Sequence, residues 1–213
     1  MASLQNERTN AGYFEQGRDD VIALLPQGVE RVLDVGCGAG ATARGLRAKG
    51  ATTLHGIELV EEAGKTAEQQ FDRVLIGSVE EKLAELEGPY DAVLCLDLLE
   101  HLADPYSVLE ELRKLTREGG YLLVSLPNAR NLMLVKDLVF RGTFGYTPHG
   151  HRDWTHLRWF TRKDAVKAFA DAGFEVIKTG TPPPRPWRRY TGMTTKPALE
   201  LTTFQWYFLA QAR

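Results

Sequence analysis

The order of apolar runs and helical patterns predicts an α/β protein with a doubly wound, mostly parallel seven-stranded sheet. Short β-branched or leucine-rich runs alternate with longer helical stretches, as in parallel sheets covered by helices on both faces. A glycine-rich turn follows the first run, where doubly wound sheets bind ligands. The last two runs have no long helix between them, so we expect an antiparallel final strand.

The same alternation sets the expected elements in chain order. Strands are predicted at Arg31–Val35, Thr53–Ile57, Arg73–Ile76, Asp91–Leu96, Tyr121–Ser125, Phe174–Thr179 and Thr202–Gln211. Helices are predicted near Ala41–Lys49, Glu61–Gln70, Val79–Glu87, Tyr106–Thr116 and Lys163–Ala172, with a helical patch at Leu132–Phe140.

The length of 213 residues and the 43% hydrophobic content predict one domain spanning residues 1–213 with a substantial core. Within it we expect an N-terminal helical cap over residues 1–29. An insertion over residues 127–160, rich in Asn, Arg, His, Gly and aromatic residues, follows the fifth strand and is expected to act as a lid. A loop over residues 181–197 contains five prolines, which oppose helix and central strand alike.

The N-terminal residues lack the apolar run of a signal peptide, and no stretch approaches the roughly 20 apolar residues of a membrane helix. Two cysteines, Cys37 and Cys95, do not make a disulfide framework. We therefore expect a cytoplasmic protein with no membrane partner.

Charge is unevenly distributed along the chain, although the net charge is only −2. Residues 58–118 carry 6 basic and 16 acidic side chains, whereas residues 119–213 carry 14 basic and 6 acidic ones. The basic segment favours a small anionic partner, the alternative being an ordinary solvated surface. RNA is a rival partner because residues 187–190 combine Trp, Arg and Tyr, but a pI near 6.2 disfavours a general nucleic-acid surface.

The glycine-rich turn carries the strongest functional signal. Gly36, Gly38 and Gly40 follow a strand and precede a helix, so the backbone can approach a ligand closely. Glu58 follows the second strand, where a carboxylate can accept hydrogen bonds from both hydroxyls of a ribose. The Gly-x-Gly-x-Gly spacing departs from the dinucleotide pattern, and Asp34 would repel a pyrophosphate. That charge favours S-adenosyl-L-methionine, with its sulfonium and ammonium groups, over NAD.

The run Val-Leu-Asp-Val-Gly-Cys-Gly-Ala-Gly at residues 32–40 resembles motif I of the class I S-adenosylmethionine-dependent methyltransferases, whose fold is Rossmann-like. Four further segments resemble later motifs of that family in the same order, namely Gly56–Leu59, Gly77–Glu80, Tyr90–Leu102 and Glu118–Asn128.

The resemblance implies a set of cofactor-binding residues. It comprises Tyr13, Arg18, Asp34, Gly36, Cys37, Gly38, Gly40, Glu58, Leu59, Ser78, Val79, Asp97 and Leu98. In related proteins an aromatic residue and an Arg of an N-terminal helix contact the cofactor, which implies Tyr13 and Arg18; a staple contact and a surface ion pair are the alternatives. Ser78 departs from the family, since many members carry Asp there to reach the adenine amino group.

Histidines supply the candidate catalytic groups, because an oxygen acceptor of high pKa needs a general base. We expect His156 or His101 to be the base, with Asp153 orienting a histidine or binding a substrate hydroxyl. A capping contact beside Glu100 is the alternative for His101. The insertion resembles a pattern of bacterial methyltransferases associated with sugars and cell-surface polysaccharides, and also methyltransferase-like proteins associated with methionine biosynthesis.

Acceptor-binding residues are expected in the insertion and at the end of the fifth strand, namely Asn128, Tyr146, His151 and Arg152. A metal site built from the insertion's own histidines and Asp153 lacks firm ligand spacing, so no metal is expected.

The predicted function is therefore S-adenosylmethionine-dependent methyl transfer to oxygen or nitrogen of a small polar acceptor, sugar-like or a natural product. Two alternatives stay open: a non-catalytic S-adenosylmethionine-binding regulatory partner and an NAD-dependent oxidoreductase. The sequence specifies neither the acceptor nor the oligomeric state.

Overall fold

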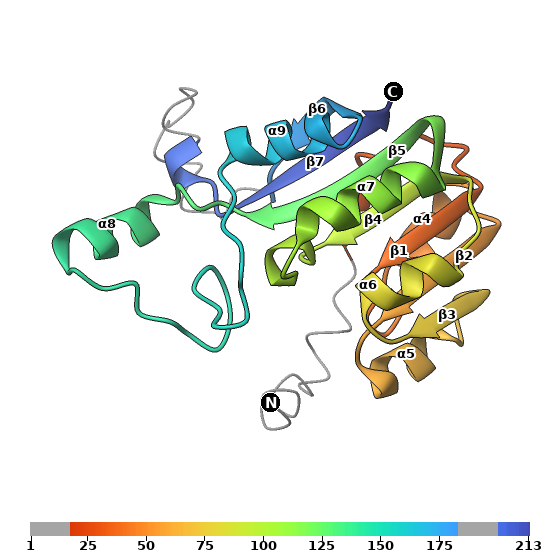
Figure 1. The fold of residues 1–213 in the computed structure, drawn as a ribbon, viewed down its shortest axis with the longest axis horizontal. Coiled ribbons are helices and arrows are strands. Elements are labelled where there is room, and N and C mark those ends of the chain that lie inside the picture. Colours follow the sequence, from red (N-terminus) through yellow and green to blue (C-terminus); the bar gives the residue numbers. More distant parts are fainter. Residues whose placement is uncertain (1–17, 183–199) are drawn as a thin grey trace.

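Seven strands form one mixed sheet in the computed structural model, which describes residues 18–182 and 200–213 (Figure 1). They are β1 (Arg31–Val35), β2 (Thr53–Glu58), β3 (Arg73–Ile76), β4 (Tyr90–Leu96), β5 (Thr116–Pro127), β6 (Phe174–Gly180) and β7 (Gln205–Ala212). Their order is β3-β2-β1-β4-β5-β7-β6. Strands β1 to β5 pair in parallel, and β7 is antiparallel to both of its neighbours. The predicted fold class is confirmed.

Helices cover both faces of this sheet. The described helices are α3 (Asp19–Ile22), α4 (Ala43–Ala48), α5 (Glu61–Ala67), α6 (Val79–Lys82), η1 (Leu83–Glu85), η2 (Leu99–His101), α7 (Pro105–Leu115), α8 (Leu132–Phe140) and α9 (Arg162–Asp171). Apolar residues of α6, α7 and α9 join one buried cluster, and those of α3, α4 and α5 join another. The sheet therefore separates two cores, as in doubly wound proteins.

The alternating side chains of the first strand show why this arrangement forms. Leu33 and Val35 enter the core beneath α6, α7 and α9, whereas Val32 enters the opposite core. Successive side chains of a strand point to opposite faces. A strand that is apolar at both its odd and its even positions is therefore buried on both faces of the sheet.

Three elements depart from prediction as follows, and most of the others differ by one to three residues at an end. Strand β5 begins at Thr116 rather than Tyr121, because Thr116 pairs with Tyr90 across an irregularity in the ladder. The predicted helix 79–87 is divided into α6 and the 3-10 turn η1. Residues 200–202 are helical, so β7 begins three residues later than expected. Most of the predicted N-terminal cap and of the proline-rich loop lies outside the described residues.

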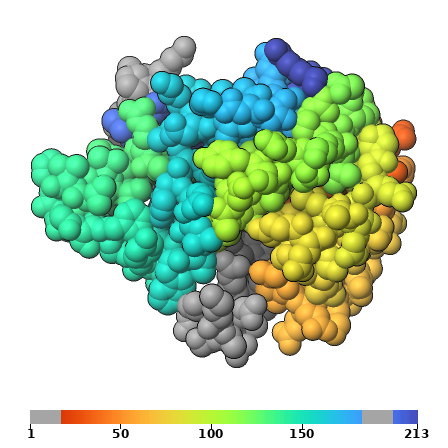
Figure 2. All heavy atoms as spheres, in the orientation of Figure 1, coloured from red at the N-terminus to blue at the C-terminus, as the bar shows by residue number. Residues whose placement is uncertain are grey.

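The insertion after β5 lies at the carboxyl end of the parallel strands. Figure 1 shows α8 and the segment after it standing away from the sheet at the end to which β4 and β5 point, and Figure 2 shows them as a lobe beside the body. The backbone N–H groups of Leu157 and Arg158 both donate to the carbonyl of Glu100, at 2.7 and 3.0 Å. The insertion is thus tied to η2, directly after β4. No helix of the described chain is long and apolar enough to span a bilayer.

Candidate active site

A cavity of about 410 Å³ lies at the carboxyl ends of β1, β2 and β4. The sheet order reverses between β1 and β4, the position at which doubly wound sheets bind ligands. The cavity volume lies within the roughly 300–1,000 Å³ of typical small-molecule sites.

The glycine turn after β1 forms one wall of this cavity. Gly36 has a φ of 78° and Gly38 one of 56°, a region that side chains disfavour. The N–H of Gly36 donates to the carbonyl of Ile57 at 2.8 Å, which ties the turn to the end of β2. A Cβ on Gly36 would meet Leu98 Cδ1 at 3.4 Å. Glycine here therefore keeps the turn close to the loop after β4.

Glu58 is held in the cavity wall by backbone donors. Its side chain is 6% exposed, and its two oxygens accept from the N–H of Val60 at 2.8 Å and of Gly38 at 2.9 Å. Each carboxylate oxygen has a further lone pair. The carboxylate is therefore oriented by its own chain and can still accept hydrogen bonds from a diol.

Asp34 is the most buried acidic group of this wall, at 1% exposed. Its Oδ2 accepts from the Thr42 hydroxyl at 2.6 Å. Burial raises its pKa to about 6; the nearby Glu58 also raises it, whereas the Thr42 hydrogen bond and Arg18 lower it. A cationic ligand would favour its ionised form.

Asp97 adopts a strained backbone conformation at the end of β4, with a φ of 54°. Ser125 holds it, since the Ser125 hydroxyl donates to Asp97 Oδ1 at 3.0 Å. Asp97 also accepts from Arg18 and Gln205. These contacts fix the Asp97 carboxylate in the cavity wall, at the point where the strand order reverses between β1 and β4.

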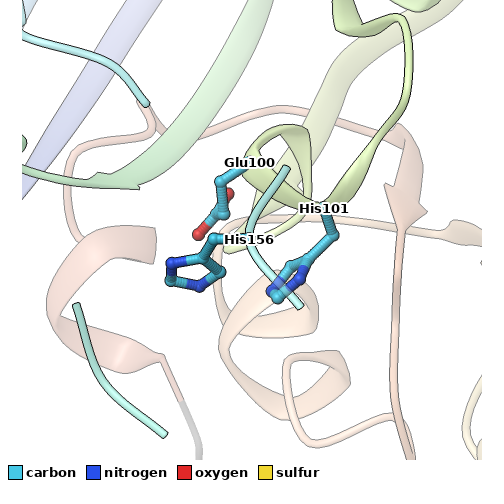
Figure 3. A group of neighbouring side chains, drawn as sticks. All are labelled: Glu100, His101 and His156. Carbon is cyan, nitrogen blue, oxygen red and sulfur yellow. The ribbon is translucent and has the colours of Figure 1, made fainter. Parts of the chain in front are cut away.

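Glu100, His101 and His156 gather at the other side of the cavity (Figure 3). One nitrogen or oxygen of each lies within 4.8 Å of the others, and the two imidazole centroids are 4.7 Å apart. His101 lines the cavity, whereas Glu100 and His156 are buried behind it, at 2% and 8% exposed. Burial raises the pKa of Glu100 well above its usual range, and the neighbouring Asp97 raises it further.

A hydroxyl links this cluster to Asp153. The Thr155 hydroxyl donates to Asp153 Oδ1 at 2.7 Å and lies 3.0 Å from His101 Nδ1. Asp153 also accepts from the Thr155 N–H at 2.8 Å. Asp153 therefore acts on His101 through Thr155 rather than by direct contact.

Comparison with known protein families identifies the fold's relatives. A family described as "Methyltransferase domain" matches residues 9–179, most of the chain. The chain belongs to the class I S-adenosylmethionine-dependent methyltransferases.

Three curated relatives of this methyltransferase are named ubiquinone biosynthesis O-methyltransferase. That of Paracidovorax citrulli is 30% identical over 167 residues, covering 73% of this chain and 68% of the relative. That of Neisseria meningitidis serogroup A is 27% identical over 162 residues, covering 70% and 66%. That of Thiobacillus denitrificans is 35% identical over 137 residues, covering 57% and 58%. The chain thus spans about three fifths to two thirds of the length of these relatives.

Solved structures share the fold of the methyltransferase. Magnesium protoporphyrin IX methyltransferase from Synechocystis PCC 6803, solved with bound S-adenosylhomocysteine, aligns with a TM-score of 0.61 and 20% identity over 92% of this chain and 81% of that one. A methyltransferase from Archaeoglobus fulgidus aligns with a TM-score of 0.64 and 20% identity over 93% and 96%.

The cavity residues of this methyltransferase fit the family's cofactor. Asp34, Glu58 and Asp97 line the cavity with Arg18 as their described basic neighbour, so its charge suits a sulfonium and an ammonium. The fixed carboxylate of Glu58 suits a ribose diol, and Leu98 offers apolar contact. Asp34 accepts a hydrogen bond from Thr42 at the start of α4, so a negative charge stands where that helix terminus would hold an NAD pyrophosphate, which disfavours the NAD alternative.

Eleven residues predicted to bind the cofactor line this one cavity. They are Arg18, Asp34, Gly36, Cys37, Gly38, Glu58, Leu59, Ser78, Val79, Asp97 and Leu98. Gly40 does not line it; a Cβ there would meet Ala67 Cα at 3.2 Å, so this glycine instead allows α5 to pack closely. Tyr13 lies outside the described residues. The cofactor contacts themselves stay predictions.

The four predicted acceptor-binding residues are not brought together at the cavity. Asn128 is buried, and its amide donates to the carbonyls of Glu200 and Thr203. Arg152 pairs with Asp137 at 2.9 Å, and Tyr146 is exposed beside Phe144.

His151, the fourth of these residues, packs its ring against Phe204 with centroids 3.8 Å apart. Burial lowers its pKa to about 4. These positions give the four side chains structural partners within the insertion and at its base.

Sequence reasoning missed three polar residues of the site. Glu100 was named only as a neighbour of His101, although a charged residue within an otherwise apolar Leu-Leu-Glu-His-Leu run is a signal. Thr42 and Thr155 carried no signal, since their importance depends on contacts to Asp34 and His101. Burial raises the pKa of the Cys37 thiol, in keeping with a small packing residue rather than a nucleophile.

Proposed function

We propose that this chain transfers the methyl group of S-adenosylmethionine to a hydroxyl oxygen of a small acceptor, sugar-like or a hydroxylated natural product. The single observation that carries the proposal is the position of His101. It lines the same cavity as Asp34, Glu58 and Asp97, and it is backed by a second histidine and two acidic side chains. The names of the curated O-methyltransferase relatives support oxygen as the acceptor atom.

Each wall of the cavity has a distinct task in this proposal. When bound, S-adenosylmethionine supplies a methyl group on a positively charged sulfur, which makes the methyl carbon an electrophile. Glu58 holds the ribose and Asp34 faces the amino end, so the sulfonium is positioned rather than activated.

The acceptor side must promote loss of a proton, because a hydroxyl becomes a good nucleophile only as it deprotonates. His101, coupled to His156 by ring contact and to Asp153 through Thr155, occupies the place for that task. The ring of His156 packs against that of Trp159, with centroids 5.6 Å apart, and Trp159 packs against Phe144, with centroids 4.8 Å apart. Neither Trp159 nor Phe144 lines the cavity, so these contacts support the position of His156 rather than the acceptor itself.

A methyl-transfer assay with an acceptor panel tests the proposal. Purified chain and S-adenosylmethionine are incubated with catechols, hydroxylated quinols, free sugars and nucleotide-linked sugars, and S-adenosylhomocysteine release is measured beside the mass of each acceptor. A mass gain of one methyl group on oxygen supports the proposal. Methylation confined to amines contradicts oxygen as the acceptor atom. Cofactor binding without turnover on any compound contradicts the proposal as a whole and favours the regulatory-partner alternative.

A further inference from the structure

We propose that Glu100, His101 and His156 bind a divalent transition-metal cation beside the acceptor end of the cavity. The three side chains come from two segments, η2 and the insertion, and converge in Figure 3. Their ligand atoms lie within 4.8 Å of one another, a separation that a shared ion bridges with small side-chain adjustments.

The carboxylate of Glu100 is the first observation in favour of a cation. Both of its oxygens are fully buried, and neither accepts a hydrogen bond from another residue of the described chain; its own backbone N–H is a nearby donor. Buried polar groups are almost always hydrogen-bonded, and buried carboxylates are paired or coordinate metals. A cation between Glu100 and the two imidazoles would satisfy the oxygens that the chain leaves unsatisfied.

The outer contacts of the histidines are the second observation. His101 Nδ1 lies 3.1 Å from the carbonyl oxygen of Thr155, and His156 Nδ1 lies 3.3 Å from that of His151. A carbonyl only accepts, so these contacts favour the tautomer with the proton on Nδ1, and Nε2 is then the ring nitrogen that can coordinate a cation. Metal-binding histidines show this arrangement, because a backbone acceptor fixes their tautomer and ring orientation.

The charge around the cluster is the third observation. Asp97 and Asp153 both lie close enough to Glu100 to interact with it electrostatically, and so does Arg18. Arg18 is already engaged by Asp97. A divalent cation would therefore enter a region with an excess of negative charge.

The ligand set indicates the class of ion. Two imidazoles and one carboxylate suit Zn²⁺ and related first-row ions, whereas Mg²⁺ and Ca²⁺ prefer sites made of oxygen atoms. Three protein ligands leave a further coordination position. His101 lines the cavity, so that position lies on the acceptor side.

One consequence rests on the proposed function: with the cation bound, His101 is a ligand rather than the base, and water takes the proton of the acceptor. A hydroxyl oxygen bound at that position would lose its proton to water more readily, because the cation stabilises the resulting anion. The oxygen then forms its bond to the methyl carbon as the carbon–sulfur bond breaks, and the electron pair of that bond stays on sulfur. S-adenosylhomocysteine and the methyl ether result.

Equilibrium dialysis of the full chain against Zn²⁺, with metal content measured by mass spectrometry, tests the site without cofactor or acceptor. We expect one Zn²⁺ per chain. Glu100→Gln and His156→Ala should each weaken binding at least about tenfold, as loss of a ligand does. His149→Ala is the matched control, because His149 is an exposed histidine of the same insertion, and it should bind as the native chain does.

Cobalt(II) provides a second readout, since its visible absorption reports nitrogen and oxygen ligation. The native chain and His149→Ala should share one spectrum that His156→Ala loses. Circular dichroism establishes that each variant is folded; if Glu100→Gln is not, His101→Ala takes its place. Absence of stoichiometric Zn²⁺ in the native chain, or equal affinities in all variants, overturns the proposal.

The metal site and the proposed function fail separately in these measurements. Metal binding without turnover on any hydroxyl acceptor retains the site and removes the function. If dialysis finds no bound metal and a chelator does not reduce turnover, the metal site is contradicted and the proposed function is supported.

Discussion

Two buried glutamates, Glu58 in the cavity wall and Glu100 behind His101, differ in how many hydrogen-bond donors the described residues give them. Glu58, 6% exposed, accepts one backbone N–H on each oxygen. Glu100, 2% exposed, accepts none on either oxygen from the described residues. Burial of a carboxylate is costly in both places, but only at Glu58 do the chain's own donors offset that cost.

The difference separates a preorganised binding group from an incompletely satisfied one. Glu58 keeps its orientation with the cavity empty, because the donors of Gly38 and Val60 come from the turns that form the wall. The described residues give Glu100 no comparable donors, and a bound cation would supply the missing partner. The cofactor end thus carries its own donors, whereas in our proposal the acceptor end depends on a cation.

The largest effect is expected for His101→Ala at the acceptor end. Turnover should fall roughly 10²–10⁴-fold, the usual contribution of a group that promotes proton transfer. Steady-state kinetics with the acceptor found in the panel measures this. Affinity for S-adenosylhomocysteine, measured by calorimetry, should change little, and a parallel loss would show that the two ends are not independent.

Glu58→Ala should lower the affinity for the cofactor rather than the turnover rate. Removal of a carboxylate that accepts two ribose hydroxyls should weaken S-adenosylhomocysteine binding about a hundredfold, since hydrogen bonds to charged groups contribute about 1.5–3 kcal/mol each. Calorimetry checks it. Glu80→Ala is the matched control, because Glu80 lines the same cavity but is exposed. Equal affinities in both variants would contradict the role of Glu58.

Asp34→Asn sharpens the electrostatic side of the cofactor end. The Asp34 pKa is raised from 3.8 to about 6 by burial, so the folded chain binds more protons than the unfolded chain between those values. Through this group the free energy of unfolding rises as pH falls from about 6 to 4, by roughly 2–3 kcal/mol. Above pH 6 the cost of the buried charge is constant.

Urea unfolding of the native chain and of Asp34→Asn across pH 4–8 measures this contribution. The stability difference, native minus variant, should increase on acidification through that window. A difference that is flat with pH would mean that the Asp34 carboxyl titrates normally in the folded chain.

The smallest effect is expected at Thr155, a positioning residue. Thr155→Val removes the hydroxyl between Asp153 and His101 and should lower turnover about tenfold, as loss of an outer-shell contact does. Thr155→Ser keeps the hydroxyl and should recover most of the rate. The pH profile of kcat should shift only in Thr155→Val; identical profiles in both variants would assign Thr155 a purely structural role.

Local patterns were sufficient for the sheet and the cofactor end. Strands β1 and β3 have the predicted bounds, because apolar runs between turn residues report burial directly. Glycines before a helix and an acid after the second strand are local in sequence, and the sheet brings the carboxyl ends of neighbouring strands together. Gly40 does not line the cavity, and only the packing of α5 distinguishes a ligand contact from a close approach of elements; its predicted cofactor contact stays a prediction.

The sequence by itself determined the fold class, the family and twelve of the twenty residues that line the cavity, since each depends on periodicity or on short motifs. Tertiary structure alone decided the acceptor end. His156 meets Glu100 and His101 because the insertion folds back and donates two backbone hydrogen bonds to Glu100, more than fifty residues away along the chain. No local pattern reports such a contact, and a buried carboxylate without a partner is visible only once every neighbouring donor has been placed.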